Sequence, residues 1–259
     1  MQETLEFLDL LRLNDERSAA FRDAVASAPS LDAQVPSCPG WTLFDLLRHL
    51  GEGRRTWAAI VAAGPADAPP AKSVWDTPAA PREREALLDR WSASAQQLLY
   101  TLRESGPDRG CWTWWGASQS PQTAGAVARH QLQEITVHTY DAQLTAGAAQ
   151  PLPDEVALDG VDEFLHTCCV TTAAWPHEPA TVDYHATEGH SWRLTLSADG
   201  ARTTRLPDAG AGLPTADASL RATADELVLA LYGRVPVDPL KVEGDPRLFD
   251  QLLAWEPEE

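Results

Sequence analysis

Hydrophobic positions in the first two thirds of the chain recur at helical spacing, beginning with a run that starts at Leu5. Thr42 followed by Asp45 has the spacing of a capping box, which predicts the start of a helix. Gly64 and Pro65 predict the end of that helix. On this basis, long helices are predicted at about residues 2–27, 42–63, 82–105, 121–146 and 153–174.

The pattern changes after about residue 178, where apolar and polar residues alternate between turn signals. This region predicts strands in the stretches ATVDYHATE, SWRLTLSA, ARTTRLP, DASLRATA and LKVEGD, with helices at ADELVLALYGR and PRLFDQLLAW. The sequence therefore predicts an α+β protein, in which a four-helix bundle is followed by a smaller α+β domain. We place the first domain at residues 1–175 and the second at 176–259.

Composition narrows the class of protein. The chain has 259 residues, of which 44% are hydrophobic and 22% are charged, as in globular proteins that dissolve in water. The net charge of −18 argues against nucleic acid or an anionic membrane as a partner. Lysine occurs only at Lys72 and Lys241 while arginine and alanine abound, a bias that suits a GC-rich genome.

Cysteine usage and the chain start indicate a reducing compartment. Cys38, Cys111 and the adjacent pair Cys168 and Cys169 form neither a disulfide framework nor a CxxC metal motif. The first residues lack the basic and apolar regions of a signal peptide, and no stretch is apolar enough to span a membrane. We expect a cytoplasmic protein that is a monomer or a weak homodimer.

One stretch, RHQLQEITVH at residues 129–138, carries His130, Glu134 and His138 at steps of four. On a helix these side chains share one face, and neighbours in the row lie roughly 5–6 Å apart at Cβ. Glu134 and His138 can therefore reach one metal ion. The alternative for this pair is an ordinary hydrogen bond on a solvated helix face. Because steps of four drift around a helix, His130 is a fourth ligand, a group that supports the ligands or an exposed side chain, and we expect it to be exposed.

A third ligand would have to come from another helix. His49, in the run LLRHLGE, has apolar neighbours and is the candidate. The alternative is a core histidine bound to a backbone carbonyl. Cys38 has no neighbour in the sequence that would lower its pKa, so we expect a structural thiol.

At this point the motifs resemble a known family. VPSCPGWTLFDLLRHLGE followed by QEITVHTYDAQLTAG is similar to the mycothiol-dependent maleylpyruvate isomerase family, whose N-terminal part is a DinB-like four-helix bundle. ADELVLALYGRVPVDPLKVEGDPRLFDQLLAW resembles the second domain of that family. The resemblance covers nearly the whole chain.

The resemblance implies a site and a chemistry. It implies that a divalent metal, usually zinc, is held by His49, Glu134 and His138, and that Arg234 faces the metal as a catalytic residue. Two histidines and one carboxylate leave a fourth zinc position open, which is typical of catalytic sites. The cofactor implied is mycothiol, a low-molecular-weight thiol of actinobacteria. Its thiolate would add to a small electrophilic substrate, for either cis–trans isomerisation or thiol transfer.

Several residues and two other functions stay open. Asp141 and Asp45 are candidates to orient the histidines, although a capping role explains Asp45 without a metal. Trp112, Trp114 and Trp115 either line a substrate pocket or pack the end of the bundle, and we expect two of them to pack. The competing functions are a zinc-dependent hydrolase without thiol and a non-catalytic small-molecule binder.

Overall fold

A computed structural model gives the structure of most of the chain. Within the described residues the chain divides into two compact units, each treated by itself below. The first unit is Met1–Trp114 with Gln122–Leu152, and the second is Trp115–Pro121 with Pro153–Glu259. The residues described are 5–74, 79–207, 214–237 and 240–255.

The division point differs from the one placed at residue 175. Helix α5 (Asp154–Thr167) packs on α6 (Ala224–Leu231) and strand β3 (Gly200–Arg205), so it belongs to the second unit. It also ends earlier than the predicted residue 174. The short segment Trp115–Pro121 leaves the bundle loop and joins the second unit as well. Neither assignment follows from local periodicity, because both depend on which partner buries the segment.

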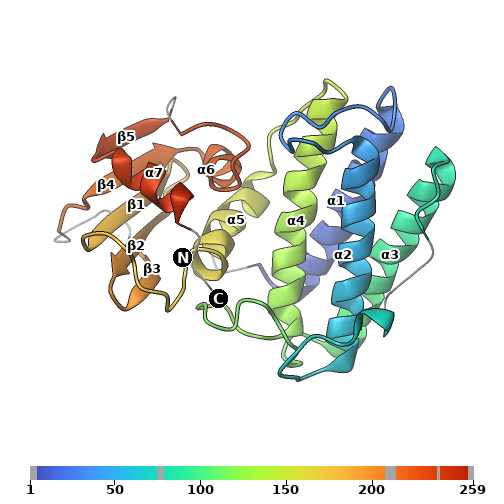
Figure 1. Cartoon of the computed structure of the whole chain (residues 1–259), viewed down its shortest axis with the longest axis horizontal. Coiled ribbons are helices and arrows are strands. Elements are labelled where there is room, and N and C mark those ends of the chain that lie inside the picture. The colour runs from blue at the N-terminus through green and yellow to red at the C-terminus, as the bar shows by residue number, and fades with distance from the viewer. Residues whose placement is uncertain (1–4, 75–78, 208–213, 238–239, 256–259) are drawn as a thin grey trace. The chain divides into compact units, whose positions relative to one another are not determined.

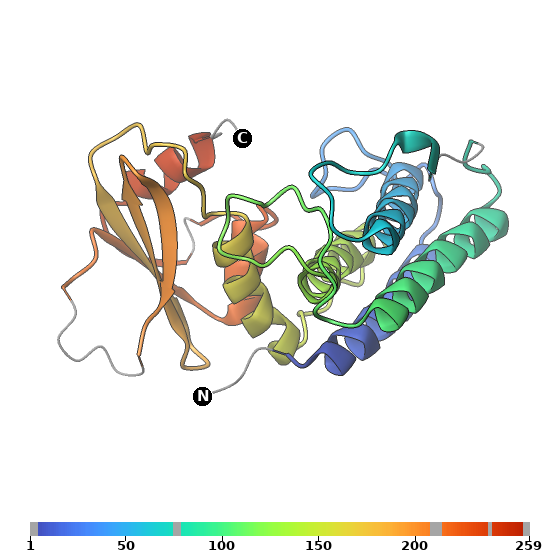
Figure 2. The same cartoon turned by 90° about the horizontal axis from the view of Figure 1, so that it is seen from below.

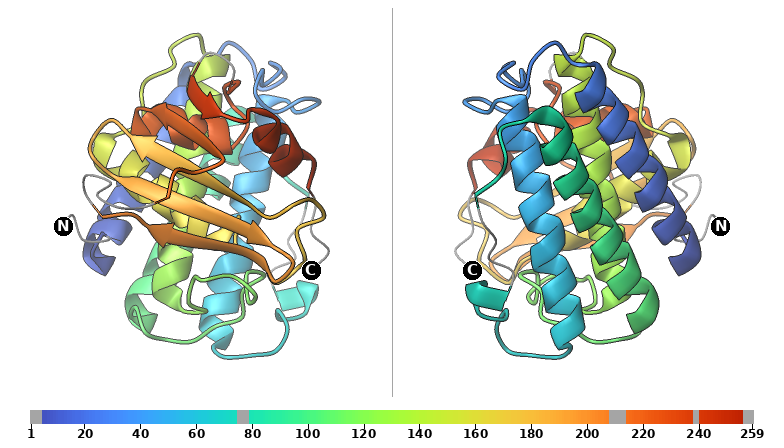
Figure 3. Two further views of the ribbon diagram at one scale, coloured as in Figure 1. Left: turned by 90° about the vertical axis from the view of Figure 1, so that its left-hand side faces the viewer. Right: turned by 90° about the vertical axis from the view of Figure 1, so that its right-hand side faces the viewer.

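The first unit is a four-helix bundle, seen from the side of its helices on the right of Figure 3, with α2 and α4 nearly end-on in Figure 2. α1 packs chiefly on α4 and α2 on α3, with further contacts between α1 and α3 and between α2 and α4. The four helices lie close to the predicted ranges, and a short 3₁₀ turn precedes α3. Their bounds are Phe7–Ser27 for α1, Leu43–Ala63 for α2, Lys72–Val74 for the 3₁₀ turn, Arg84–Ser105 for α3 and Ala124–Thr145 for α4 (Figure 1).

Helix α2 begins and ends where the sequence predicted. The Thr42 side chain accepts a hydrogen bond from the Asp45 amide, and the Asp45 carboxylate accepts from the Thr42 backbone, which completes the capping box. Gly64 closes the helix at a φ of +80°, a conformation that favours glycine. These ends fix how far His49 lies from the bundle end.

Helix α4 is the most enclosed helix of the bundle. Its buried residues include apolar side chains such as Leu132 and Ile135, and polar ones such as Gln131, Gln133 and Thr136. Because burial runs around most of the helix, its sequence shows no clean apolar stripe. This explains why the face that carries Glu134 and His138 could not be assigned from the pattern alone.

The second unit is built on a five-stranded sheet with strand order β3-β2-β1-β4-β5 (Figure 1). β1 pairs parallel with β4, and the other neighbours are antiparallel. All five strands correspond to predicted ones. Their bounds, with the helix that ends the unit, are Ala180–Ala186 for β1, Ser191–Ser197 for β2, Gly200–Arg205 for β3, Ala218–Ala222 for β4, Lys241–Gly244 for β5 and Arg247–Ala254 for α7.

One face of this sheet is apolar and covered by helices. Val182 and Leu194 are fully buried there. Trp192 donates from its indole nitrogen to Asp162 of α5 at 2.7 Å, and Tyr184 meets Phe249 of α7 with ring centroids 6.3 Å apart. Alternation along the strands thus gives one face to the core, as expected for a sheet covered on one side.

Two further expectations concern chemistry outside the fold itself. All four cysteines are free thiols, in agreement with the absence of a disulfide framework in the sequence pattern. Among the residues that the structure describes, no helix has both the length and the apolar character needed to cross a membrane.

Candidate metal centre

Three side chains from two helices of the bundle meet at one point. His49 comes from α2, and Glu134 and His138 come from α4. His49 Nε2 lies 2.9 Å from Glu134 Oε1, and His138 Nε2 lies 3.5 Å from the same oxygen. All three ligand atoms lie within 4.8 Å of one another. The predicted convergence of these residues is therefore present in the structure.

His138 is held from its other nitrogen by Asp141. Its Nδ1 lies 2.7 Å from Asp141 Oδ2, one turn further along α4. A carboxylate can only accept, so Nδ1 carries the proton and Nε2 points toward Glu134. Asp141 is fully buried, which keeps the pair in one geometry. This is the orienting role that the spacing of these two residues predicted.

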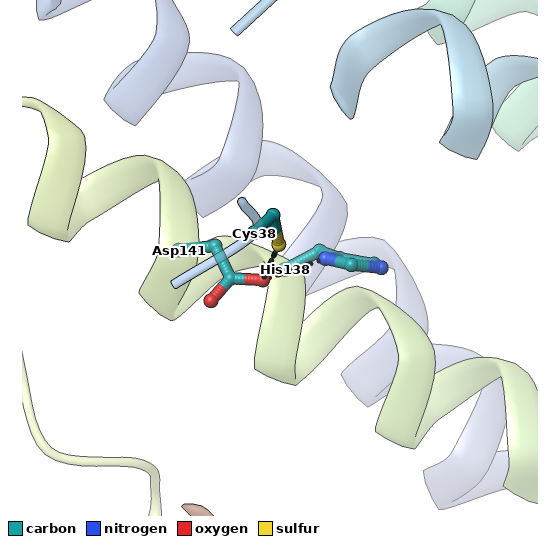
Figure 4. A group of neighbouring side chains, drawn as sticks. All are labelled: Cys38, His138 and Asp141. Carbon is teal, nitrogen blue, oxygen red and sulfur yellow. Dashed lines mark hydrogen bonds and ion pairs between the residues drawn. The ribbon is translucent and has the colours of Figure 1, made fainter. Parts of the chain in front are cut away.

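The loop before α2 closes around Asp141. Ser37 Oγ donates to Asp141 Oδ1 at 2.5 Å, and Cys38 Sγ donates to Asp141 Oδ2 at 3.4 Å. Figure 4 shows Cys38 and His138 approaching the Asp141 carboxylate. The ligand atoms of Cys38, His138 and Asp141 also lie close enough together to hold a metal, but hydrogen bonds already account for their arrangement. Cys38 is thus a donor to a buried carboxylate, in line with the structural thiol expected.

A tight turn delivers this loop. Trp41 N donates to the Cys38 carbonyl at 3.0 Å, with Pro39 between them and Gly40 at a φ of +81°, the pattern of a type II turn. The turn places Trp41 beside the site, with its ring centroid 4.9 Å from that of His49 and 6.4 Å from that of His138. The CPGW sequence is therefore what positions both Cys38 and Trp41.

The site is electrostatically coupled. Burial alone would lower the pKa of His138, but hydrogen bonds to Asp141, Cys38 and Glu134 outweigh it and hold that pKa well above its usual value. Burial alone would raise the pKa of Glu134, but hydrogen bonds from His138 and His49 hold it well below its usual value. Without a metal, His138 is therefore a cation between two carboxylates. A divalent cation at Nε2 would replace that proton.

The donor set fits a divalent metal such as zinc. Tetrahedral bonds of about 2.0–2.1 Å put ligand atoms roughly 3.3 Å apart. The observed separations of 2.9 and 3.5 Å lie on either side of this value. His49 and Glu134 keep exposed side-chain fractions of 40% and 26%, so the group is reachable from solvent. Two imidazoles and one carboxylate leave a coordination position for a further ligand.

His130 does not join this group. Its ring lies 5.6 Å from Trp114 and 6.3 Å from Trp57, centroid to centroid, and the side chain is half-buried. The expectation that His130 is exposed is wrong, because the two tryptophans cover it. Trp115 is buried and belongs to the second unit, Trp112 is half-buried, and Trp114 is 38% exposed.

A buried arginine lies in the same part of the bundle. Arg54, on α2, is 0% exposed. Its Nη1 donates to Asn14 Oδ1 at 3.1 Å, and its Nη2 donates to the Gln131 carbonyl at 3.5 Å. Burial lowers the pKa of Arg54 to about 10, opposed by the charge of Glu134. Arg54 therefore remains a cation at neutral pH.

Comparison with known proteins assigns the family. Residues 11–143 match the family profile of the mycothiol maleylpyruvate isomerase N-terminal domain, and residues 155–251 match that of the MDMPI C-terminal domain. The chain belongs to the mycothiol maleylpyruvate isomerase family. The family assignment made from the motifs, and with it the assignment to a family of enzymes, is confirmed. No curated protein matches the sequence.

Solved structures support the same architecture. The crystal structures of the mycothiol-dependent maleylpyruvate isomerase and of a histidine-to-alanine mutant of it each match with a TM-score of 0.61 at 14% identity. Each match covers 92% of this chain and 93% of the other. At this identity the likeness concerns the fold, and it confirms the predicted bundle followed by an α+β domain.

Two further candidate residues of this family member have local partners in the structure. Asp45 is engaged in the capping box and an ion pair with Arg48, which agrees with the structural role expected. Arg234 follows α6 in the second unit, and its Nη1 donates to the Tyr232 carbonyl at 2.7 Å. Its role in catalysis stays a prediction.

Sequence reasoning missed three contributors. Ser37, Trp41 and Arg54 reach the site region only through packing of the loop and of α2 on α4. The prolines and glycine of VPSCPGW indicate a break in the chain, and a break directly before a helix that carries a candidate ligand could have signalled the first two. A buried arginine has no such signal, because its sequence neighbours are ordinary helix residues.

Proposed function

We propose that this protein is a metal-dependent enzyme that uses a low-molecular-weight thiol, of the mycothiol type, to act on a small electrophilic substrate. The observation that carries the proposal is the meeting of His49, Glu134 and His138, with Asp141 fixing the tautomer of His138. Family membership and the printed name of the matched enzyme point to the thiol. Either cis–trans isomerisation or thiol transfer fits this chemistry.

In this proposal each side chain of the site has a separate role. His49, Glu134 and His138 hold a divalent metal, zinc by the chemistry of its ligands. The metal supplies a positive charge that stabilises the thiolate form of a bound thiol. Asp141 keeps Nδ1 of His138 protonated, so that Nε2 offers its lone pair. Trp41 packs beside the two imidazoles.

Metal content and thiol dependence test the proposal together. Protein purified without an affinity tag is analysed for bound metal, then loaded with Co²⁺ and titrated with mycothiol, and with glutathione in parallel. We expect one equivalent of metal and a change in the cobalt spectrum on addition of thiol, from direct Co–S bonding. Turnover of electrophilic substrates should require metal and thiol together.

The competing functions give different results. A hydrolase predicts full turnover by the metal-loaded protein without any thiol and no thiol-dependent change in the cobalt spectrum. A binder predicts neither bound metal nor turnover. Either result would overturn the proposal. The His49→Ala variant is the matched control, since it removes one ligand from α2 and leaves α4 intact.

A further inference from the structure

A positive charge is buried in the bundle, and none of its hydrogen-bond acceptors among the described residues is a carboxylate. The two acceptors of Arg54 there, the Asn14 side chain and the Gln131 carbonyl, are neutral. Its Nε is buried and has no hydrogen-bond acceptor among the described residues. A buried cation of this kind is costly unless a negative charge lies near.

The negative charge that acts on Arg54 belongs to the donor set. Glu134 raises the pKa of Arg54 electrostatically. The geometry agrees, because Arg54 bonds to the carbonyl of Gln131, which precedes Glu134 by three residues on α4. Residues three apart on a helix lie on the same side, one above the other. Arg54 therefore contacts α4 about one turn from Glu134, inside the bundle.

The positive charge of Arg54 changes the total charge of the metal-loaded site. Glu134 and Asp141 contribute two negative charges, and Arg54 contributes one positive charge. A divalent metal with two neutral imidazoles brings the total to one positive charge. A single anion at the open position then makes the buried group neutral. Without Arg54 the metal-loaded site would already be neutral, and an anion would leave it negative.

We propose that Arg54 is a positioning residue whose fixed buried charge makes this site prefer a singly negative ligand, such as a thiolate, over a neutral one. The inference rests on the proposed metal site. It goes beyond that site in assigning the preference for an anion to a residue that is neither a ligand of the metal nor in contact with the open position. Charge, and not shape, is what Arg54 contributes.

Two small ligands distinguish an effect of the charge of Arg54 from an effect of Arg54 on the structure of the site. Co²⁺-loaded protein is titrated at one pH and ionic strength with thiocyanate, an anion, and with imidazole, which is neutral in most of its population at pH 8. The visible cobalt spectrum reports both. We expect Arg54→Met to weaken thiocyanate binding about tenfold, the scale of two charges roughly 10 Å apart at an effective dielectric constant of about 20. The affinity of Arg54→Met for imidazole should stay within about twofold of the wild-type value. Arg54→Lys keeps the positive charge, so its affinities for both ligands should stay within about twofold of the wild type.

A second variant neutralises the charge of Arg54 without replacing the arginine. Asn14→Asp places a carboxylate on Arg54 and cancels its charge while the arginine stays in place. We expect it to weaken thiocyanate binding selectively, as Arg54→Met does. If Arg54→Met does not fold, as judged by circular dichroism, Asn14→Asp decides by the same criterion.

The outcomes distinguish this inference from the function it rests on. If the wild-type protein binds no Co²⁺, the proposed function fails. If Co²⁺ binds and the charge-cancelling variants weaken thiocyanate and imidazole equally, Arg54 acts through structure and the inference is overturned. Unchanged thiocyanate affinity in those variants would also overturn it.

Discussion

Asp141→Asn tests whether a buried carboxylate sets the metal affinity. Asp141 is fully buried and accepts from His138 Nδ1 at 2.7 Å, from Ser37 at 2.5 Å and from Cys38 at 3.4 Å. The asparagine amide has nearly the same shape but only one acceptor oxygen and no charge. It cannot serve all three donors, so the ring of His138 loses its fixed orientation.

The expected size follows from two independent scales. A hydrogen bond to a charged group contributes about 1.5–3 kcal/mol. Loss of a group that orients a metal-bound histidine costs about 10–100-fold in metal affinity, or about 1.4–2.8 kcal/mol. We therefore expect zinc affinity to fall by about 10–100-fold. Competition with a chromophoric chelator at fixed pH measures it directly.

A matched control lies on the partner helix. Asp45→Asn removes a carboxylate that also lies one turn from a histidine of the donor set in the sequence, but one that caps α2 through Thr42. It should lower the free energy of unfolding by about 0.3–1 kcal/mol, the scale of a negative charge at a helix N-terminus, and leave zinc affinity unchanged. If Asp141→Asn folds and binds zinc within about twofold of the wild type, the orienting role of Asp141 is refuted.

Three further predictions test the proposed function and the metal-free donor set. Glu134→Gln should lower the metal content after purification, since it removes the charged ligand, and unchanged content would rule out that role. Arg234→Ala should lose turnover and keep its metal; an unaltered kcat and KM would remove Arg234 from catalysis. In metal-free protein, burial lowers the pKa of His138, but its bonds to Asp141 outweigh burial and leave that pKa raised. The stabilisation by protonated His138 is complete below the unfolded pKa of about 6.5 and is lost as pH rises through the folded pKa. Urea unfolding of the metal-free protein should therefore show a free energy of unfolding that falls above about pH 6.5. The His138→Gln variant should not show this fall.

Most helices and strands could be predicted from the local sequence. The capping box at Thr42, the glycine after α2 and the alternation in β1 and β2 each act over a few residues, so they could be located without a structure. The end of α5 was not predicted. Apolar and β-branched residues continue past Thr167, and the helix stops because the following chain pairs with β3 through Thr171.

The sequence also contained most of the donor set, but not its geometry. Glu134 and His138 share a face because four residues make about one helical turn, which the sequence alone dictates. His49 became a candidate by composition and family resemblance. Its distance of 2.9 Å from Glu134 depends on how α2 packs against α4, a contact between residues 85 positions apart.

The sequence by itself determined the local features: helix ends, strand alternation and the spacing of Glu134, His138 and Asp141. Only the tertiary structure decided the long-range features: Trp41 against the histidines, Asp141 as the acceptor for Ser37 and Cys38, and the contact of buried Arg54 with α4. The physical reason is range. Backbone propensities and hydrogen-bonded turns act between neighbours in the chain, whereas burial and charge act between groups that only packing brings together.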